Sequence, residues 1–123
     1  MNWQMRLWID ALRSGEYEQG SGALQTRDGK FCCLGVLCDV YRKETGDGAW
    51  VNDVDSKPFK TDNGMYGGAY PPVRVYVWLG VEYIDLGTVE GIYGPVMPVV
   101  ANDTLRWTFD QIADALERRY AGT

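Results

Sequence analysis

The sequence predicts an α+β fold: a small single domain of about three helices and one short helix, packed with a small, mostly antiparallel sheet. Three observations support this prediction. Amphipathic helical patterns lie near both ends of the chain, an almost wholly apolar segment lies in its first third, and short strand-like stretches bounded by glycine turns lie between them. With 123 residues the chain can bury one sizeable core, so we predict a single globular domain over residues 1–123.

The apolar segment 31–41, FCCLGVLCDVY, is the centre of the predicted fold. We predict a helix over 33–45, buried on several sides because Asp39 is its only polar residue before Tyr41. Gly35 costs such a helix about 1 kcal/mol relative to alanine, which indicates that another backbone passes close to it. An Asp-Gly pair just before the segment predicts a tight hairpin that runs directly into the helix.

Amphipathic helices are predicted at both ends of the domain. The first covers 2–13 and places these residues on one face: Trp3, Leu7, Trp8, Ala11 and Leu12. The second covers 108–120, where Thr108 and Gln111 match a capping box. Its two arginines at positions 118 and 119 suit the negative end of a helix dipole.

The middle of the chain is rich in glycine, aspartate and tyrosine and reads mainly as loops. Short strands are predicted at 49–51 and 58–60, and an edge strand at 96–101, where prolines argue against a central position. Residues 71–79 allow two interpretations. Alternating valines favour a strand, whereas the leading prolines and the glycine at position 80 favour a short helix.

Several blocks of the sequence resemble a family of small proteins from bacteriophages and prophages. These blocks are the CCLGVLCD segment at 32–39, the PPVRVYVWLG segment at 71–80, and an ND pair at 102–103 followed by TFDQIADALE at 108–117. The loop Tyr17-Glu18-Gln19-Gly20 is similar too. The resemblance implies a phage origin, a compact fold and a helix rather than a strand over 71–79. It implies no established chemistry.

Charge and composition exclude several classes of function. A net charge of -5 argues against nucleic acid as a partner, because phosphate binding needs a clustered basic face. No run approaches 18 apolar residues, so we expect no membrane span. The first residues lack the pattern of a secretory signal, and three cysteines, two of them adjacent, suit a reducing compartment. We therefore expect a protein of the host cell cytoplasm.

Catalysis is the less favoured interpretation. The chain has no histidine, which removes Ser-His and Cys-His dyads and histidine-ligated metals. We interpret the cysteines as core residues and expect no catalytic residue, metal or cofactor. A carboxylate-dependent hydrolase stays open as an alternative, with Glu82 and Asp85, or Glu90 and Asp103, as its acid pair.

Binding fits the composition better, since five tryptophans and eight tyrosines are a high aromatic load and many lie beside glycines. We predict a phage binding protein without enzyme activity, a counter-defence factor that sequesters a nucleotide-derived small ligand. The alternative is an inhibitor that blocks a host protein through an aromatic patch. The oligomeric state is left open.

A ligand site is predicted where the hairpin meets the start of the 33–45 helix, because free N–H groups and the helix dipole favour an anion there. An aromatic ring and an amide from the loop could stack on and hydrogen-bond a base. The predicted ligand-binding residues are Tyr17, Gln19, Gly20, Arg27, Lys30, Asn102 and Trp107.

Overall fold

A computed structural model describes residues 1–122 and confirms the predicted α+β class. Within these residues it has five helices and one three-stranded antiparallel sheet. The elements in chain order are α1 Trp3–Arg13, α2 Cys33–Thr45, β1 Ala49–Trp50, β2 Phe59–Lys60, β3 Tyr66–Gly67, α3 Val73–Leu79, α4 Pro98–Asp103 and α5 Phe109–Tyr120. None of these helices is long and apolar enough to cross a lipid bilayer.

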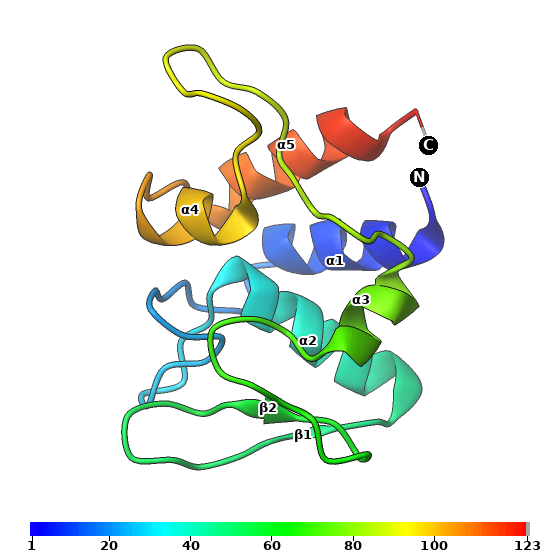
Figure 1. Cartoon of the computed structure of the whole chain (residues 1–123), viewed down its shortest axis with the longest axis vertical. Helices are drawn as coiled ribbons and strands as arrows, with labels where there is room; N and C mark the ends of the chain where they lie inside the picture. Colours follow the sequence, from blue (N-terminus) through cyan, green and yellow to red (C-terminus); the bar gives the residue numbers. More distant parts are fainter. Residues whose placement is uncertain (123) are drawn as a thin grey trace.

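Helix α1 lies between α5 and α2, with the sheet on the far side of α2 (Figure 1). Buried Trp8 joins α1 to α2 because its indole N–H donates to the carbonyl of Cys33 at 2.9 Å. On the other side, two arginines of α1 pair with α5: Arg6 with Glu117 and Arg13 with Asp114, each at 2.7 Å. The N-terminal helix thus holds the two halves of the domain together.

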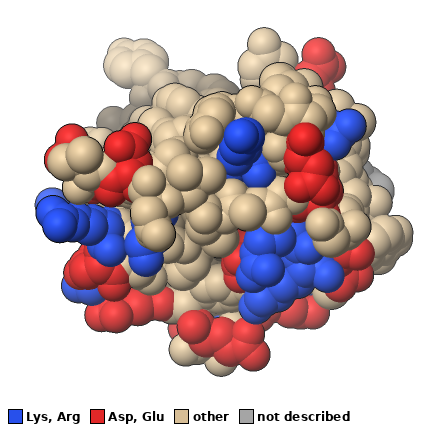
Figure 2. All heavy atoms as spheres, turned by 90° about the horizontal axis from the view of Figure 1, so that it is seen from below, with Lys and Arg blue, Asp and Glu red and all other residues tan. Residues whose placement is uncertain are grey.

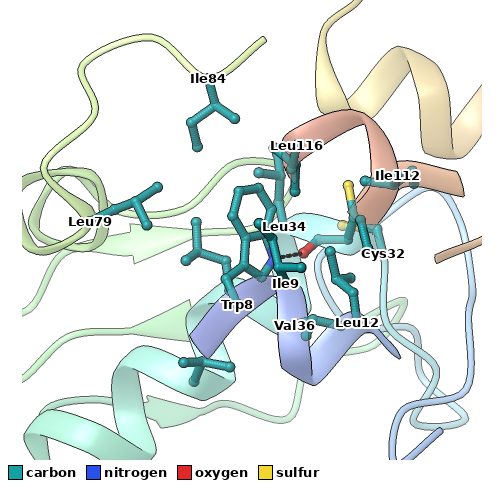
Figure 3. Packing of buried hydrophobic residues seen from close by; sticks show 14 of the residues in the cluster. Trp8, Ile9, Leu12, Cys32, Leu34, Val36, Leu79, Ile84, Ile112 and Leu116 are labelled. Atoms are coloured by element: carbon teal, nitrogen blue, oxygen red, sulfur yellow. Dashed lines mark hydrogen bonds between the residues drawn. The ribbon is translucent and has the colours of Figure 1, made fainter. Parts of the chain in front are cut away.

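Helix α2 is the buried centre of the fold, as the sequence predicts (Figure 3). Every residue from Cys33 to Tyr41 is buried. A Cβ on Gly35 would overlap the backbone of Leu24, which confirms that another segment crosses the helix at this glycine. The helix ends at Gly46 in a left-handed conformation with φ 74°, where glycine carries no steric penalty.

The hairpin before α2 is present but very short. Its turn contains Asp28 and Gly29, and the amide of Thr26 donates to the carbonyl of Lys30 at 2.8 Å. The chain then passes directly to the first turn of α2, where the side chain of Cys32 accepts a hydrogen bond from the amide of Gly35.

The sheet is built from three strands of two residues each, in the order β1-β2-β3. The first two lie within the predicted strands, whereas β3 falls in a stretch that the sequence predicted as loop. Phe59 of β2 is fully buried and lies 5.0 Å from the Trp50 ring and 6.2 Å from the Tyr41 ring of α2. Edge-to-face aromatic contacts therefore fasten this small sheet to the central helix.

Helix α3 confirms the helical interpretation of 71–79. The alternating valines separate by helical spacing: Val75 is buried together with Leu79, four residues on, whereas Val73 and Val77 are both exposed. Gly80 ends the helix at φ 76°.

The predicted edge strand at 96–101 is wrong, because residues 98–103 form helix α4. Pro98 occupies the first turn of this helix, where its missing N–H is not needed. The valines favour a strand, but a short helix buries Ala101 and Asn102 on one side, and this tertiary burial outweighs the local preference.

Both helices at the ends of the chain lie where the sequence predicts them. At the start of α5, the Thr108 hydroxyl accepts from the amide of Gln111, and the Gln111 side chain accepts from the amide of Thr108. The capping box is therefore complete.

Candidate functional site

Gln19 and Asn102 form a polar knot where the 16–22 loop meets α4 and α5. The side-chain N–H₂ of Gln19 donates to Asn102 Oδ1 at 2.9 Å and to the carbonyl of Trp107 at 2.8 Å, and its Oε1 accepts from the amide of Phe109. Asn102, which is 3% exposed, donates to the carbonyl of Gly20 at 2.8 Å. These two amides thus fix the loop against both helices.

A polar hollow of about 250 Å³ opens beside this knot. Its lining residues are Gln19, Gly20, Ser21, Asn102, Arg106 and Trp107. Gly20 is required for packing, since a Cβ there would lie 2.7 Å from the Cβ of Lys30. Four residues of the predicted site, Gln19, Gly20, Asn102 and Trp107, therefore do come together around one hollow.

Trp107 also lines a second hollow of about 300 Å³, together with Gln111, Asp114 and Arg118. Within residues 1–122, the side chains of Arg106 and Arg118 have no hydrogen-bond or ion-pair partner, whereas Asp114 is paired with Arg13. The partly buried indole of Trp107 is thus accompanied by an unpaired guanidinium in each hollow. The site combines an aromatic ring with two free cations.

Arg106 has a backbone that side chains rarely adopt. It is the one residue other than glycine in the described chain with a positive φ, at 56°. The left-handed conformation lets the chain reverse between α4 and α5, and the amides of Leu105 and Trp107 donate to the carbonyls of Val100 and Ala101. Such a conformation costs a residue with a side chain about 1 kcal/mol relative to glycine.

Three residues predicted for the site line neither hollow: Tyr17, Arg27 and Lys30. The ring of Tyr17 packs edge-to-face on Phe31, and its hydroxyl donates to Asp39 at 2.6 Å. The Lys30 ammonium lies 3.7 Å from Glu18 and 3.8 Å from Asp28, and Arg27 is exposed on the hairpin turn. Neither cation of the hairpin lines the two hollows, so the cations of the site are Arg106 and Arg118 in place of the predicted Arg27 and Lys30.

The first turn of α2 is also occupied by protein groups. The amide of Cys33 donates to Asn102 Oδ1 at 3.2 Å, and that of Gly35 donates to the sulfur of Cys32 at 3.4 Å. Both cysteines are buried. An anion at this helix end would have to displace Asn102, so we move the candidate site from the start of α2 to the hollows around Trp107.

Arg106, Arg118 and Ser21 are the site residues that sequence reasoning missed. An arginine directly before a tryptophan was a usable signal. The Arg118-Arg119 pair suits the helix dipole, but the two arginines differ in the structure: Arg119 pairs with Asp85 at 2.9 Å and Arg118 does not.

The pKa values of the three core cysteines and of Asp85 do not suit catalysis. Burial raises the pKa of Cys32 to about 11 and those of Cys33 and Cys38 further, so the thiols stay protonated at neutral pH. Hydrogen bonds from Arg119 hold the pKa of Asp85 below its ordinary value, whereas a general acid needs a raised pKa. Among residues 1–122, no three cysteine, aspartate or glutamate side chains are grouped so that they could hold a metal ion.

The charged side chains outside the site show no single-sign field on the sheet side of the molecule. Seen from that side, lysines and arginines are interspersed with acidic residues (Figure 2).

The comparisons with known proteins give one result. The family described as "Domain of unknown function (DUF8296)" matches residues 1–120, and the chain belongs to this family. No curated protein and no solved structure matches the chain.

Proposed function

We propose that this member of the DUF8296 family is a binding protein whose ligand is a small anion with an aromatic ring, of the nucleotide type. The observation that carries the proposal is that Trp107 lines two hollows, each of which also holds an arginine whose side chain is unpaired within residues 1–122: Arg106 in one and Arg118 in the other. A base can stack on the indole while a phosphate pairs with a guanidinium. The two hollows of about 250 and 300 Å³ lie near the lower limit for small-molecule sites, which suits a mononucleotide-sized ligand.

The lining of the first hollow supports this chemistry further. Ser21 is exposed at its edge and offers a hydroxyl, and the loop that carries it is held by Gln19 and Asn102. Because these amides are already bonded to protein groups, they act as rigid supports and the ligand is recognised by the groups beside them. A rigid site loses little entropy when it binds a ligand.

The biological role we propose is sequestration of a nucleotide-derived signal in an infected cell, without catalysis. The resemblance of the CCLGVLCD block and the C-terminal helix to phage proteins supports this setting. In the hydrolase alternative, the lowered pKa of Asp85 argues against this carboxyl as the proton donor.

The test is isothermal titration of the protein with linear and cyclic mononucleotides, followed by the variant R106A/R118A. Removal of two charge-assisted contacts should weaken binding at least about tenfold. The control is R27A/K57A, which removes the same charge from exposed or partly exposed positions outside the hollows. If both variants lose affinity equally, the effect is general electrostatics. If only the control loses it, the ligand binds at the hairpin. Either result contradicts the proposed site.

A second candidate function is inhibition of a partner protein. It is supported by four large apolar side chains that are exposed on the 83–97 segment: Tyr83, Ile92, Tyr93 and Met97. The variant I92S/Y93S separates the two functions. If the protein acts through this surface, I92S/Y93S should abolish its effect in cells and leave nucleotide binding intact. Under the nucleotide proposal, R106A/R118A should abolish the effect and I92S/Y93S should not.

A further inference from the structure

A separate cavity of about 330 Å³ lies between α3, α4 and the segment that follows α3. Tyrosines contribute much of its wall, and Glu82 is the only charged residue in it. The residues that matter for its chemistry are Tyr70, Tyr76, Tyr83, Glu82, Leu34 and Met97. None of them lines the hollows around Trp107.

The end of α3 shapes this cavity. Gly80, at φ 76°, reverses the chain after the helix, and Asn2 donates to the carbonyl of Leu79 at 2.7 Å. Ile84 is 4% exposed and anchors the returning segment in the core. Glu82 and Tyr83, which lie between Gly80 and Ile84, therefore line the cavity. Opposite, the first turn of α4 supplies Pro98 and its neighbours.

The electrostatics of the cavity favour a positive ligand. Within the described chain, the carboxylate of Glu82 has no hydrogen-bond or ion-pair partner, and no lysine or arginine lines the cavity. Burial raises the pKa of Tyr76 to about 12, so this phenol remains neutral at physiological pH. Neutral aromatic rings attract cations through their quadrupole, and a carboxylate adds a full negative charge.

The apolar part of the lining narrows the class of cation. Leu34, Ile84, Pro98 and the valines of α4 give the cavity a predominantly apolar surface. A metal ion would need several oxygen ligands, and the cavity offers one carboxylate. A cation whose charge is surrounded by alkyl groups loses little hydration on entry and contacts both the rings and the aliphatic side chains.

We propose that this cavity binds an organic cation, an alkylated ammonium compound with apolar substituents. The inference goes beyond the proposed function, because it concerns a second site with a ligand of opposite charge. Tyr83, which is 77% exposed, stands at the opening, and Tyr76 lies deeper and is partly buried.

The experiment titrates the ¹⁵N-labelled protein with choline and, separately, with its neutral isostere 3,3-dimethylbutan-1-ol, and follows amide chemical shifts. The isostere has the same shape without the charge. We expect saturable shifts of residues around the cavity with choline and roughly tenfold weaker binding of the isostere. Equal binding of both compounds would show an apolar pocket without cation selectivity, and absence of saturable shifts would exclude the site. Both outcomes overturn the proposal.

Variants of the cavity wall test whether choline binds in this cavity. E82Q and Y83A should each weaken choline binding several-fold, about what one exposed charge contact or one cation–π contact provides. Both side chains are exposed, so the fold should persist, and the Tyr83 carbonyl that accepts from Tyr120 is kept. The controls E90Q and Y93A remove an exposed carboxylate and an exposed ring outside the cavity. Loss of choline binding in the controls, or full binding in E82Q and Y83A, would contradict the site.

Discussion

The hydroxyl of Tyr17 donates a hydrogen bond of 2.6 Å to the carboxylate of Asp39, 22 positions further along the chain. The same carboxylate accepts from the Trp50 indole and from the Arg42 guanidinium, each at 2.9 Å. Asp39 is 5% exposed, so it is a charge buried with its partners rather than a free ligand group. It joins the 16–22 loop, α2 and the sheet at one point.

Tyr17→Phe should therefore destabilise the protein without changing ligand binding. Loss of a hydrogen bond to a charged acceptor costs roughly 1.5 kcal/mol, and the Phe31 contact is retained. Urea unfolding measures the change, with Tyr93→Phe as the control because Tyr93 is fully exposed. Unchanged stability together with lost nucleotide binding would return Tyr17 to the ligand site.

Stability should fall below about pH 4, in part through Asp39. Burial raises the pKa of this carboxyl, but hydrogen bonds from Tyr17, Trp50 and Arg42 outweigh burial and leave its pKa below the ordinary value. A carboxyl with a lower pKa in the folded state stabilises the protein above its unfolded pKa, and the stabilisation is lost as pH falls through the folded pKa.

Asp39→Asn should lower stability at neutral pH and flatten this acid-dependent loss. Urea midpoints between about pH 2 and pH 6 measure both effects across the range in which carboxyls titrate. An acid profile as steep as that of the unchanged protein would show that other carboxyls cause the loss.

Much of the fold could be predicted because local signals agreed with the tertiary structure. The capping box at Thr108 marks the start of a helix, and the apolar run around Gly35 marks a buried helix that another backbone approaches closely. Helix α4 could not be predicted in this way, since its valines favour strands and its burial depends on contacts with α2 and α5. Strand β3 has two residues, of which Gly67 must approach the Tyr70 carbonyl closely, and no local pattern marks it.

The candidate site could be predicted only in part, because some of its residues are placed by tertiary contacts. Gln19, Asn102 and Trp107 do meet: the side chains of Gln19 and Asn102 suit polar contacts between loops and helix ends, and Trp107 takes part through its backbone carbonyl. The hairpin is held by tertiary contacts that the sequence does not specify, among them the packing of Tyr17 on Phe31 and the hydrogen bond from the amide of Lys57 to the carbonyl of Gln25. Without such contacts, the sequence alone could not show whether Arg27 and Lys30 lie at the candidate site.

Gly35→Ala should destabilise the protein strongly, although alanine is the better helix former. A methyl group would overlap the Leu24 backbone, and displacement of a packed backbone costs about 3 kcal/mol or more. Gly68→Ala is the matched control, since its Cβ would meet no atom within 4 Å. Thermal unfolding compares the two variants. A mild effect of Gly35→Ala would mean that the crossing at α2 is looser than described.

Native protein should react with thiol reagents only after it opens. All three cysteines are buried, and burial raises their pKa values, that of Cys32 to about 11, so little thiolate exists at neutral pH. Labelling followed by mass spectrometry should show no modification in native buffer and three modifications in denaturant. Fast labelling of one thiol in native buffer would identify a reactive cysteine and reopen the question of catalysis.

Arg106→Gly should separate stability from binding. Glycine adopts the left-handed conformation freely, so the variant should be up to about 1 kcal/mol more stable than the unchanged protein. The same change removes one of the two free guanidinium groups beside Trp107, so nucleotide affinity should fall. Arg106→Ala provides the control, because it removes the charge and keeps the strained backbone.

The two variants distinguish a functional arginine from a structural one. If Arg106 is present for ligand binding, both variants lose affinity to the same extent and only Arg106→Gly gains stability. Urea unfolding and isothermal titration on the same samples measure the two quantities. If Arg106→Gly is less stable, relief of the backbone strain does not outweigh the greater conformational freedom that glycine gives the unfolded chain. If affinity is unchanged in both variants, the strain at position 106 is not explained by ligand binding, and the site around Trp107 must be abandoned.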